Sequence, residues 1–236
     1  MVAIRKFTLA LALISGSGCA ADDAMPESRA QTNGWRSLFD GKTLDGWRGF
    51  KAEAPPAGWR IEDGALVFDG SGGDLLTIEQ FGDFELRLQW KIAEGGNSGV
   101  LFHVVPLGNQ IWETGPEVQL LDNARHGDGR NPLTSAGANY ALHAPARDVT
   151  RPVGKWNDLR LLVQGGHVEH WLNGEKIVEY ELWSPDWEQR VAVSKFATMS
   201  RYGRERRGHI ALQDHGDRVW FRDIQIKEGL NKSLLD

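Results

Sequence analysis

Cysteine is almost absent from this chain, which has a single one, Cys19, among its 236 residues. The domain that follows Cys19 therefore contains no internal disulfide. Beyond the first twenty residues there is also no run apolar enough to cross a membrane. The net charge of −5 comes from interspersed residues of both signs, and it lacks the basic footprint of a nucleic-acid-binding protein.

Several catalytic motifs are missing as well. The sequence contains neither a Gly-x-Ser-x-Gly nor a His-Glu-x-x-His pattern, which leaves serine hydrolases and zinc proteases without support. The segment "GGNSG" (95–99) is too short for a phosphate-binding loop and no helical pattern follows it. Helical periodicity is weak throughout, and residues 184–193 are expected to start with one short helical turn.

The N-terminus has the order of a secretory signal: basic residues at 5–6, an apolar run at 7–14 and small residues at 15–18. Cys19 follows directly, in a position similar to that of the acylated cysteine of bacterial lipoproteins. We expect residues 1–19 to be a signal peptide that ends at a lipidated Cys19, and the protein to be periplasmic or anchored to the membrane. Plain cleavage near Ala20 is the alternative.

The rest of the chain divides into a tether and one domain. Residues 20–33 are small and polar without apolar periodicity, which predicts a flexible tether. Residues 34–230 then form a domain of ordinary size for an all-β fold. Ten tryptophans are notable there, because indole rings stack well on sugar rings, although a large core can also absorb several.

Short alternating segments predict strands along the whole domain. In "FELRLQWKI" (84–92) every second residue is apolar and the others are polar or charged. Similar runs occur at 64–70, 98–105, 113–122, 157–164, 167–174, 209–216 and 219–228. Turn residues such as Asn173-Gly174 separate them. This spacing predicts an antiparallel sandwich or jelly roll. The long irregular region 123–155 is expected to rim a cleft.

Parity within the strands selects candidate polar groups. Glu117 and Gln119 share one face of "ETGPEVQLLD" (113–122), which is either a solvated surface or the floor of a cleft. Gln213 and His215 share the polar face of "HIALQDHG" (209–216). Histidine readily changes protonation state near neutral pH, so His215 is a candidate base or metal ligand, with a backbone hydrogen bond as the equal alternative.

Other candidates have stronger structural alternatives. Lys195 continues the alternating "VAVSK" and can stabilise an anionic oxygen or simply extend to solvent at a strand end. Arg87 and Gln89 can bind sugar hydroxyls, although Arg87 equally suits a surface ion pair with Glu85. Asn97 lies in a tight turn, where it can bond backbone or sugar.

Trp171 and His170 lie on opposite faces of the expected strand 167–174. Trp171 is a candidate sugar platform, whereas large aromatic residues more often belong to a core. His170, on the other face, is expected to pack inside the sandwich with a satisfied hydrogen bond.

A divalent metal stays an open question. Asp122, His126 and Asp128 offer ligands that suit a hard cation such as Ca²⁺ or Mg²⁺. Their spacing matches no calcium-binding loop, and a solvated polar loop is the stronger expectation.

Five segments together are similar to one bacterial family. They are "SLFDGKTLDGWRG" (37–49), "DFELRLQWKIAEGGNSGVLFHV" (83–104), "TGPEVQLLD" (114–122), "WNDLRLLVQGGHVEHWLNG" (156–174) and "GHIALQDHGDRVWFRDIQIK" (208–227). In this order they resemble the 3-keto-disaccharide hydrolase family, also described as 3-keto-α-glucoside 1,2-lyase and 3-keto-2-hydroxyglucal hydratase. The resemblance implies a concanavalin A-like jelly-roll sandwich of two antiparallel sheets that acts on sugars oxidised at C3.

The chemistry of such a substrate assigns roles. Cleavage needs a base near C2, a cation or donor at the ketone oxygen and a proton donor at the glycosidic oxygen. The resemblance therefore favours catalytic roles for His215, Glu117 and Lys195. The expected sugar-binding residues are Gln119, Arg87, Gln89, Asn97, Trp171, Gln213 and His103, the last at a position where family members commonly carry arginine. The alternatives are a non-catalytic carbohydrate-binding module and an ordinary glycosidase with two carboxylates.

Overall fold

The computed structural model describes residues 33–230. The expected signal peptide, Cys19 and all but the last residue of the expected tether lie outside the described residues. Within residues 33–230, no helix has both the length and the apolar character needed to cross a membrane.

Strands make up most of the described chain. They are β1 Trp35–Ser37, β2 Trp47–Gly49, β3 Trp59–Glu62, β4 Ala65–Phe68, β5 Leu75–Thr77, β6 Phe84–Ile92, β7 Asn97–Val104, β8 Glu117–Leu121, β9 Asn157–Gln164, β10 His167–Leu172, β11 Glu175–Glu181, β12 His209–Leu212 and β13 Val219–Lys227. Helical segments are short: η1 Ile111–Glu113, η2 Gly127–Arg130, η3 Pro132–Thr134 and α1 Pro185–Ala192.

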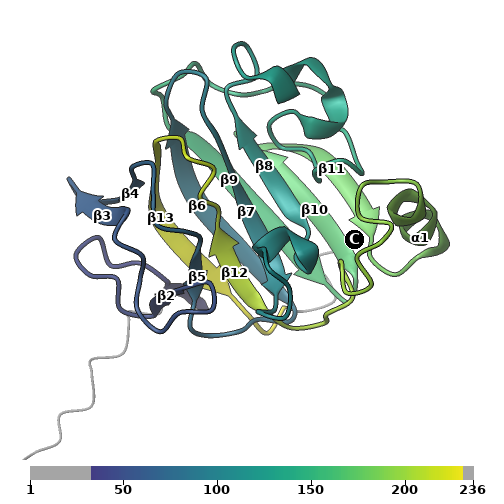
Figure 1. The fold of residues 1–236 in the computed structure, drawn as a ribbon, viewed down its shortest axis with the longest axis horizontal. Helices are drawn as coiled ribbons and strands as arrows, with labels where there is room; N and C mark the ends of the chain where they lie inside the picture. The colour runs from purple at the N-terminus through teal and green to yellow at the C-terminus, as the bar shows by residue number, and fades with distance from the viewer. Residues whose placement is uncertain (1–32, 231–236) are drawn as a thin grey trace, which may run out of the picture.

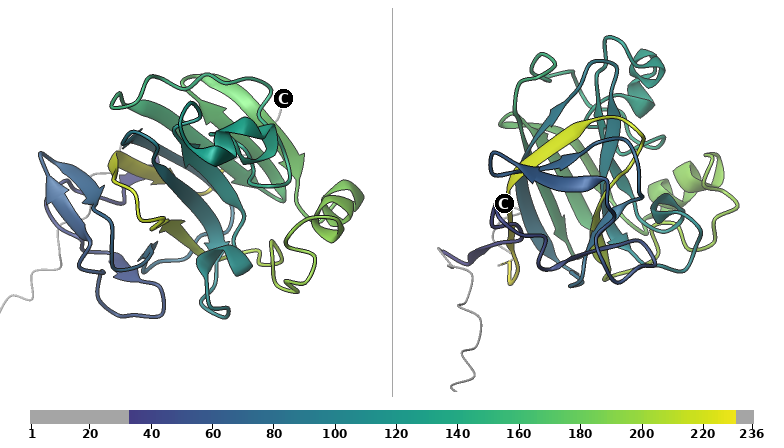
Figure 2. Two further views of the ribbon diagram at one scale, coloured as in Figure 1. Left: turned by 45° about the horizontal axis from the view of Figure 1, so that its top comes forward. Right: turned by 60° about the vertical axis from the view of Figure 1, so that its left-hand side comes forward.

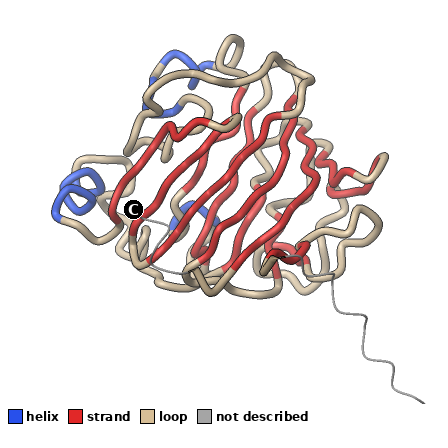
Figure 3. Tube along the Cα trace, turned by 180° about the vertical axis from the view of Figure 1, so that it is seen from behind, coloured by secondary structure: helices blue, strands red, loops and turns tan. Residues whose placement is uncertain are grey.

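The strands form two antiparallel sheets that pack face to face as a sandwich (Figures 1 and 2). The eight-stranded sheet has the order β11-β10-β9-β6-β13-β4-β3, with β1 also paired to β13, and its long strands are seen from behind in Figure 3. The five-stranded sheet has the order β2-β5-β12-β7-β8. The predicted jelly-roll sandwich is therefore confirmed.

Alternating side chains build the core between the sheets. Phe84, Leu86 and Leu88 of β6 and Val118 and Leu120 of β8 all point inward and are buried. Burial of apolar surface at roughly 25 cal/mol per Å² drives this packing. The polar residues between them are consequently directed to the two outer faces of the sandwich.

The outer face of the five-stranded sheet carries a smaller apolar cluster. It consists of Leu76, Leu101, Val104, Ile111 and Ala211, with Phe50 and Trp112 packed against it. We call this group the outer cluster. Ile111 and Trp112 of η1 pack in this cluster and hold η1 against the sheet. In Figure 1, η1 lies in front of the lower ends of β8 and β12. The connection that contains η1 thus covers part of this face.

The expected strands at 84–92 and 157–164 coincide with β6 and β9, and the others agree apart from their ends. One local prediction is wrong. Residues 185–192 form the helix α1, which Ser184 caps by accepting a hydrogen bond from the backbone N–H of Trp187, so "VAVSK" is not an alternating strand. The acidic residues at 186 and 188 also favour the helix start, because their negative charges lie near the positive end of the helix dipole.

Candidate functional site

A polar cavity of about 180 Å³ lies on the outer face of the five-stranded sheet. Its walls are Asn97, Trp112, Glu117, Gln119, Tyr140, Lys195, Gln213 and His215. All three expected catalytic residues and three of the expected sugar-binding residues therefore come together. They come from β7, β8, the loop after β12 and the connection between β11 and β12, so the cavity exists only in the folded chain.

Glu117 forms the buried floor of the cavity. Its side chain lies over Gly99 of the neighbouring strand β7, where a Cβ would come within 2.9 Å of Glu117 Cγ and Cδ. Burial raises the pKa of Glu117 to about 8, with help from the charges of Asp74 and Asp128, while Lys195 opposes the rise. The carboxyl group is therefore mostly protonated at neutral pH and can donate a hydrogen bond.

Three amide side chains present unused acceptors around this floor. The buried oxygens Asn97 Oδ1, Gln119 Oε1 and Gln213 Oε1 have no hydrogen-bond partner among the described residues. Gln119 is held in place because its Nε2 donates to the carbonyl of Thr134 at 3.2 Å. Buried acceptors without partners are costly, so a ligand with several hydroxyl donors would be stabilised here.

Lys195 projects over aromatic rings at the side of the cavity. Its Nζ lies 4.3 Å from the ring centre of Tyr140, 5.2 Å from that of Phe196 and 5.3 Å from that of Trp112. Burial lowers the pKa of Lys195, and the charges of Glu117 in its ionised form and of Asp128 act against that shift. The rings stabilise the ammonium group without neutralising its charge.

A column of stacked rings fixes the segment that carries Lys195. Phe196 stacks on Tyr202 with centroids 3.8 Å apart, and Tyr202 stacks on Trp187 of α1 at 5.9 Å. Trp187 stacks in turn on Tyr180 of β11 at 5.6 Å. The helix α1 therefore positions Lys195 through packing, and the strand expected at this point would not have done so.

Trp112 and Tyr140 complete the aromatic wall. The Glu113 carboxylate accepts hydrogen bonds from the backbone N–H groups of Asn109 and Gln110, which shapes η1 and directs Trp112 to the cavity. The Tyr140 hydroxyl donates to Asp128 Oδ2 at 3.2 Å, and burial, followed by the charge of Asp128, raises the pKa of Tyr140 to about 12. Tyr140 is therefore a neutral donor at any ordinary pH.

His215 stands at the mouth of the cavity. It lies three residues beyond the end of β12, in a loop rather than on the expected strand, and its side chain is 47% exposed. Its Nε2 is 3.4 Å from Asn97 Nδ2, and its Nδ1 is 3.8 Å from Asp217 Oδ2. His126 packs edge-on against the ring at 5.9 Å. The ring is thus oriented and still accessible to a ligand.

Three expected sugar-binding residues lie elsewhere. Arg87 and Gln89 are on β6 and Trp171 is on β10, so they occupy the outer face of the eight-stranded sheet. They line a separate groove of about 330 Å³. The expected surface ion pair of Arg87 with Glu85 is present at 2.7 Å, and Arg160 lies over the ring of Trp171. Their assignment to the same site as Glu117 is therefore wrong.

His103 is a core residue rather than a cavity residue. Its backbone has a φ of +52°, which interrupts the alternation of β7, and its buried ring packs edge-on against Phe84 and Phe102. His103 Nε2 lies 2.9 Å from the carbonyl of Gly82, and burial lowers the pKa of His103. The expectation for His170 is confirmed: it is buried, with Nδ1 2.9 Å from the carbonyl of Gly137.

The suggested metal ligands do not form one cluster. Asp122 accepts hydrogen bonds from the backbone N–H groups of Gly95 and Ala124, whereas Asp128 faces Tyr140. Within residues 33–230, the one group of three His or acidic ligands close enough to share an ion is His167, Glu169 and Glu179 on the other sheet. Lys176 already forms ion pairs with both of its carboxylates.

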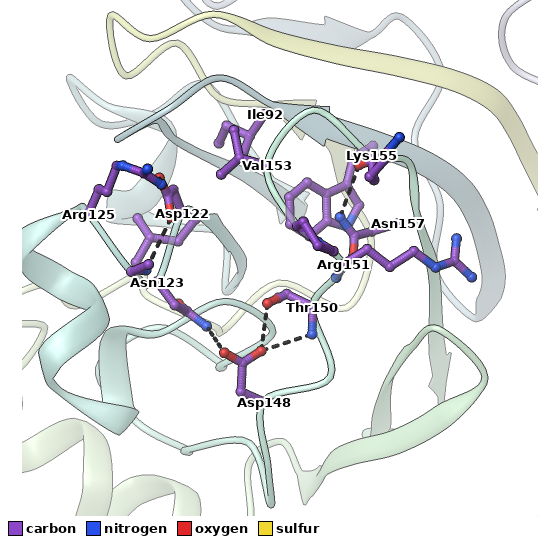
Figure 4. Close-up of a pocket in the computed structure, with 14 residues that line it drawn as sticks. Ile92, Asp122, Asn123, Arg125, Asp148, Thr150, Arg151, Val153, Lys155 and Asn157 are labelled. Carbon is purple, nitrogen blue, oxygen red and sulfur yellow. Dashed lines mark hydrogen bonds and ion pairs between the residues drawn. The ribbon is translucent and has the colours of Figure 1, made fainter.

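Another cavity, of about 320 Å³, opens at the end of the sandwich (Figure 4). Asp122, Asn123, Asp148 and Arg151 are among the residues that line it. Most of this polar lining is paired internally: Asp148 accepts from Asn123 Nδ2 at 2.9 Å and from both Thr150 donors, as the dashed lines show. This cavity does not contain the combination of buried acid, cation and free acceptors found beside Glu117.

Sequence reasoning overlooked Trp112, Tyr140 and Gly99. The two aromatic residues lie in irregular segments, where periodicity carries no information about direction. The sequence does contain an indication at Gly99, because a glycine inside a strand often marks a position that another group approaches closely. Here that group is the carboxyl of Glu117.

Comparison with known proteins agrees with this architecture. Residues 34–227 match the model of a family described as the 3-keto-alpha-glucoside-1,2-lyase-like domain. A 3-keto-disaccharide hydrolase of Bacteroides thetaiotaomicron is 35% identical, and the match covers 83% of this chain and 78% of that protein.

Solved structures are similar too. A candidate glycosyl hydrolase of Parabacteroides distasonis is 35% identical, with a TM-score of 0.79 over 86% of this chain and 99% of its own. A second from that organism is 29% identical, with a TM-score of 0.65 over 83% of this chain and 99% of its own. A galectin-like Bacillus subtilis protein, 15% identical with a TM-score of 0.52 over 82% of this chain and 98% of its own, shares the fold. The chain therefore belongs to the 3-keto-alpha-glucoside-1,2-lyase-like family.

Proposed function

We propose that this protein cleaves glycosides whose sugar ring carries a ketone at C3. The ketone acidifies the hydrogen on C2, because removal of that hydrogen gives an enolate, and the group at C1 then leaves by elimination. Addition of water to the resulting 3-keto-2-hydroxyglucal completes a net hydrolysis. The observation that carries the proposal is the convergence of Glu117, Lys195 and His215 in one cavity of a chain from this family.

Each group has a role that its surroundings support. Lys195 places a positive charge where the ketone oxygen becomes an enolate oxygen. Glu117, kept protonated by burial, donates a hydrogen bond to a substrate oxygen. The free oxygens of Asn97, Gln119 and Gln213 accept from the sugar hydroxyls. His215, accessible at the mouth, removes the proton from C2.

Turnover of a defined substrate tests the proposal. Purified protein is incubated with a 3-keto-disaccharide, and the products are followed by mass spectrometry and by the ultraviolet absorption of the enone. We expect turnover that falls by about 100-fold or more in His215→Ala. His167→Ala, which removes a histidine on β10 in the eight-stranded sheet, is the matched control. Binding without turnover in the wild type would instead support a carbohydrate-binding module, and turnover of unoxidised disaccharides an ordinary glycosidase.

The proposed place of action is the cell envelope, on the basis of the signal-like order of residues 1–19. Incorporation of labelled palmitate that is lost in Cys19→Ser would support lipidation. An unlabelled protein released with the periplasmic fraction would support plain cleavage.

A further inference from the structure

Asp74 lies next to the candidate site on the same sheet face. The pairing of Leu75 with Leu212 sets Asp74 beside Gln213, and the backbone N–H of Gln213 donates to the carbonyl of Gly99 at 3.0 Å. Because neighbouring strands lie about 4.8 Å apart, Asp74 is one strand spacing from Gln213, a wall of the polar cavity. Asp74 also has the parity of Leu76, which points outward into the outer cluster.

A larger cavity adjoins Asp74 on the side away from Gln213. It has a volume of about 440 Å³, and its lining includes Phe50, Pro55, Pro56, Asp74 and Gln110. Phe50 packs on the outer cluster together with Trp112, which lines the polar cavity. The two cavities therefore share one surface, with Asp74 and the outer cluster between them.

The Asp74 carboxyl is fixed and only partly solvated. Its Oδ1 accepts a hydrogen bond from the backbone N–H of Asp214 at 2.9 Å. Asp214 is itself held as an acceptor by the N–H groups of Gly73 and Gly216. Burial and the charge of Asp214 raise the pKa of Asp74 to about 6, against the hydrogen bond that lowers it. A larger fraction of Asp74 than of an ordinary aspartate is consequently protonated near neutral pH and able to act as an acid.

We propose that the cavity beside Asp74 binds the leaving group, and that Asp74 donates the proton to the departing glycosidic oxygen. This inference rests on the proposed function. In the step, the base takes the proton from C2, the C2 electron pair forms the C1=C2 double bond, and the C1–O bond breaks. The oxygen leaves with the electron pair of the broken C1–O bond and takes the proton from Asp74, which gives an alcohol and the 3-keto-2-hydroxyglucal. Solvent later returns a proton to Asp74, so no oxidant or reductant is consumed.

The lining of this cavity indicates the kind of leaving group. Phe50 and the two prolines offer an apolar wall, whereas Gln110 and Asp74 offer polar groups at its edge. A second sugar ring has the same combination of an apolar face and a polar rim. An aryl group would occupy the same space.

Two substrates with different leaving groups test the role of Asp74. The 3-keto derivatives of a methyl glucoside and of a 2,4-dinitrophenyl glucoside are compared, because methanol needs a proton in order to leave and dinitrophenolate does not. Asp74→Asn is expected to lower kcat/KM about 100-fold for the methyl substrate and at most about threefold for the dinitrophenyl substrate. Asp69→Asn, on the surface, is the matched control. Exchange of the C2 hydrogen in D₂O is expected to persist in Asp74→Asn.

The outcomes separate the two proposals. Equal loss on both substrates, or no loss on either, would overturn the role of Asp74 while leaving the proposed function intact. A wild-type protein that neither exchanges the C2 hydrogen nor turns over either substrate would overturn the proposed function itself. Thermal unfolding of Asp74→Asn checks that the fold is retained.

Discussion

Gly99 and Glu117 depend on each other across the pairing of β7 with β8. The carboxyl of Glu117 lies over the α-carbon of Gly99, in the space that any larger residue would fill. Gly99 does not have the positive φ that favours glycine, so what this position requires is room. A glycine in one strand thereby lets the carboxyl of the next strand be buried beneath the cavity.

Gly99→Ala should therefore displace the Glu117 carboxyl. The added methyl group meets the end of a flexible side chain rather than backbone, so we expect a stability loss of only about 1–3 kcal/mol. Activity towards a 3-keto-disaccharide should fall at least about tenfold, because the donor at the cavity floor moves. Gly127→Ala, where a Cβ meets no atom within 4 Å, is the control for the loss of a glycine. Wild-type activity in Gly99→Ala would show that the position of Glu117 does not matter.

Burial of Glu117 should make stability depend on pH. The pKa of Glu117 is raised from 4.5 to about 8 in the folded chain. Below pH 4.5 the group is protonated in both states. Between pH 4.5 and 8 only the unfolded state releases the proton, so the free energy of unfolding should fall by about 1.4 kcal/mol per pH unit from this group. Above pH 8 its contribution levels off.

Glu117→Gln removes this titration. The free energy of unfolding of wild type and variant is measured by urea unfolding between pH 5 and 9 and plotted against pH. The wild-type curve should fall more steeply than the curve of the variant, because only the wild type loses stability through Glu117. Parallel curves would contradict a protonated Glu117 in the folded state. The comparison cancels the titrating groups that do not interact with Glu117, because the two proteins share them.

Strand alternation predicted the faces of individual residues well. Glu117 and Gln119 share a face, as expected, because the side-chain period of a strand is two. Arg87 and Gln89 show the same pattern in the sequence and nevertheless lie on the opposite side of the sandwich. Alternation states which residues of a strand face together, whereas the sheet to which that strand belongs depends on pairing between distant segments.

The position of Lys195 could not be derived from local pattern at all. Its place results from the stacking of Phe196, Tyr202 and Trp187, residues that come from the helix α1 and the connection after it. The alternation of "VAVSK" makes Lys195 a candidate and the family resemblance favours a catalytic role for it, but the strand parity that orients it is wrong.

The charge of Lys195 should matter for turnover. Lys195→Met keeps a long apolar stem among the rings and removes the cation, so kcat/KM should fall about 100- to 1,000-fold. Lys195→Arg retains a cation and should recover part of that loss. The pKa of Glu117 should rise further in Lys195→Met, because Lys195 opposes the rise in the wild type. Lys176→Met, which removes a lysine from the other sheet, is the control.

The outer face of the eight-stranded sheet should not contribute to catalysis. Arg87 and Trp171 line their own groove there, on the far side of a sandwich whose sheets are about 10 Å apart. Arg87→Ala and Trp171→Ala should therefore leave kcat/KM for a 3-keto-disaccharide within about threefold of wild type, the range expected when no substrate contact is lost. Trp112→Ala, which removes a ring from the wall of the polar cavity, should raise KM by about tenfold or more, because stacking on an indole ring contributes to sugar binding. Steady-state kinetics with all three variants, each checked by thermal unfolding, shows which outer face of the sandwich binds the substrate. A loss of turnover in folded Trp171→Ala together with normal turnover in Trp112→Ala would move the substrate to the eight-stranded sheet.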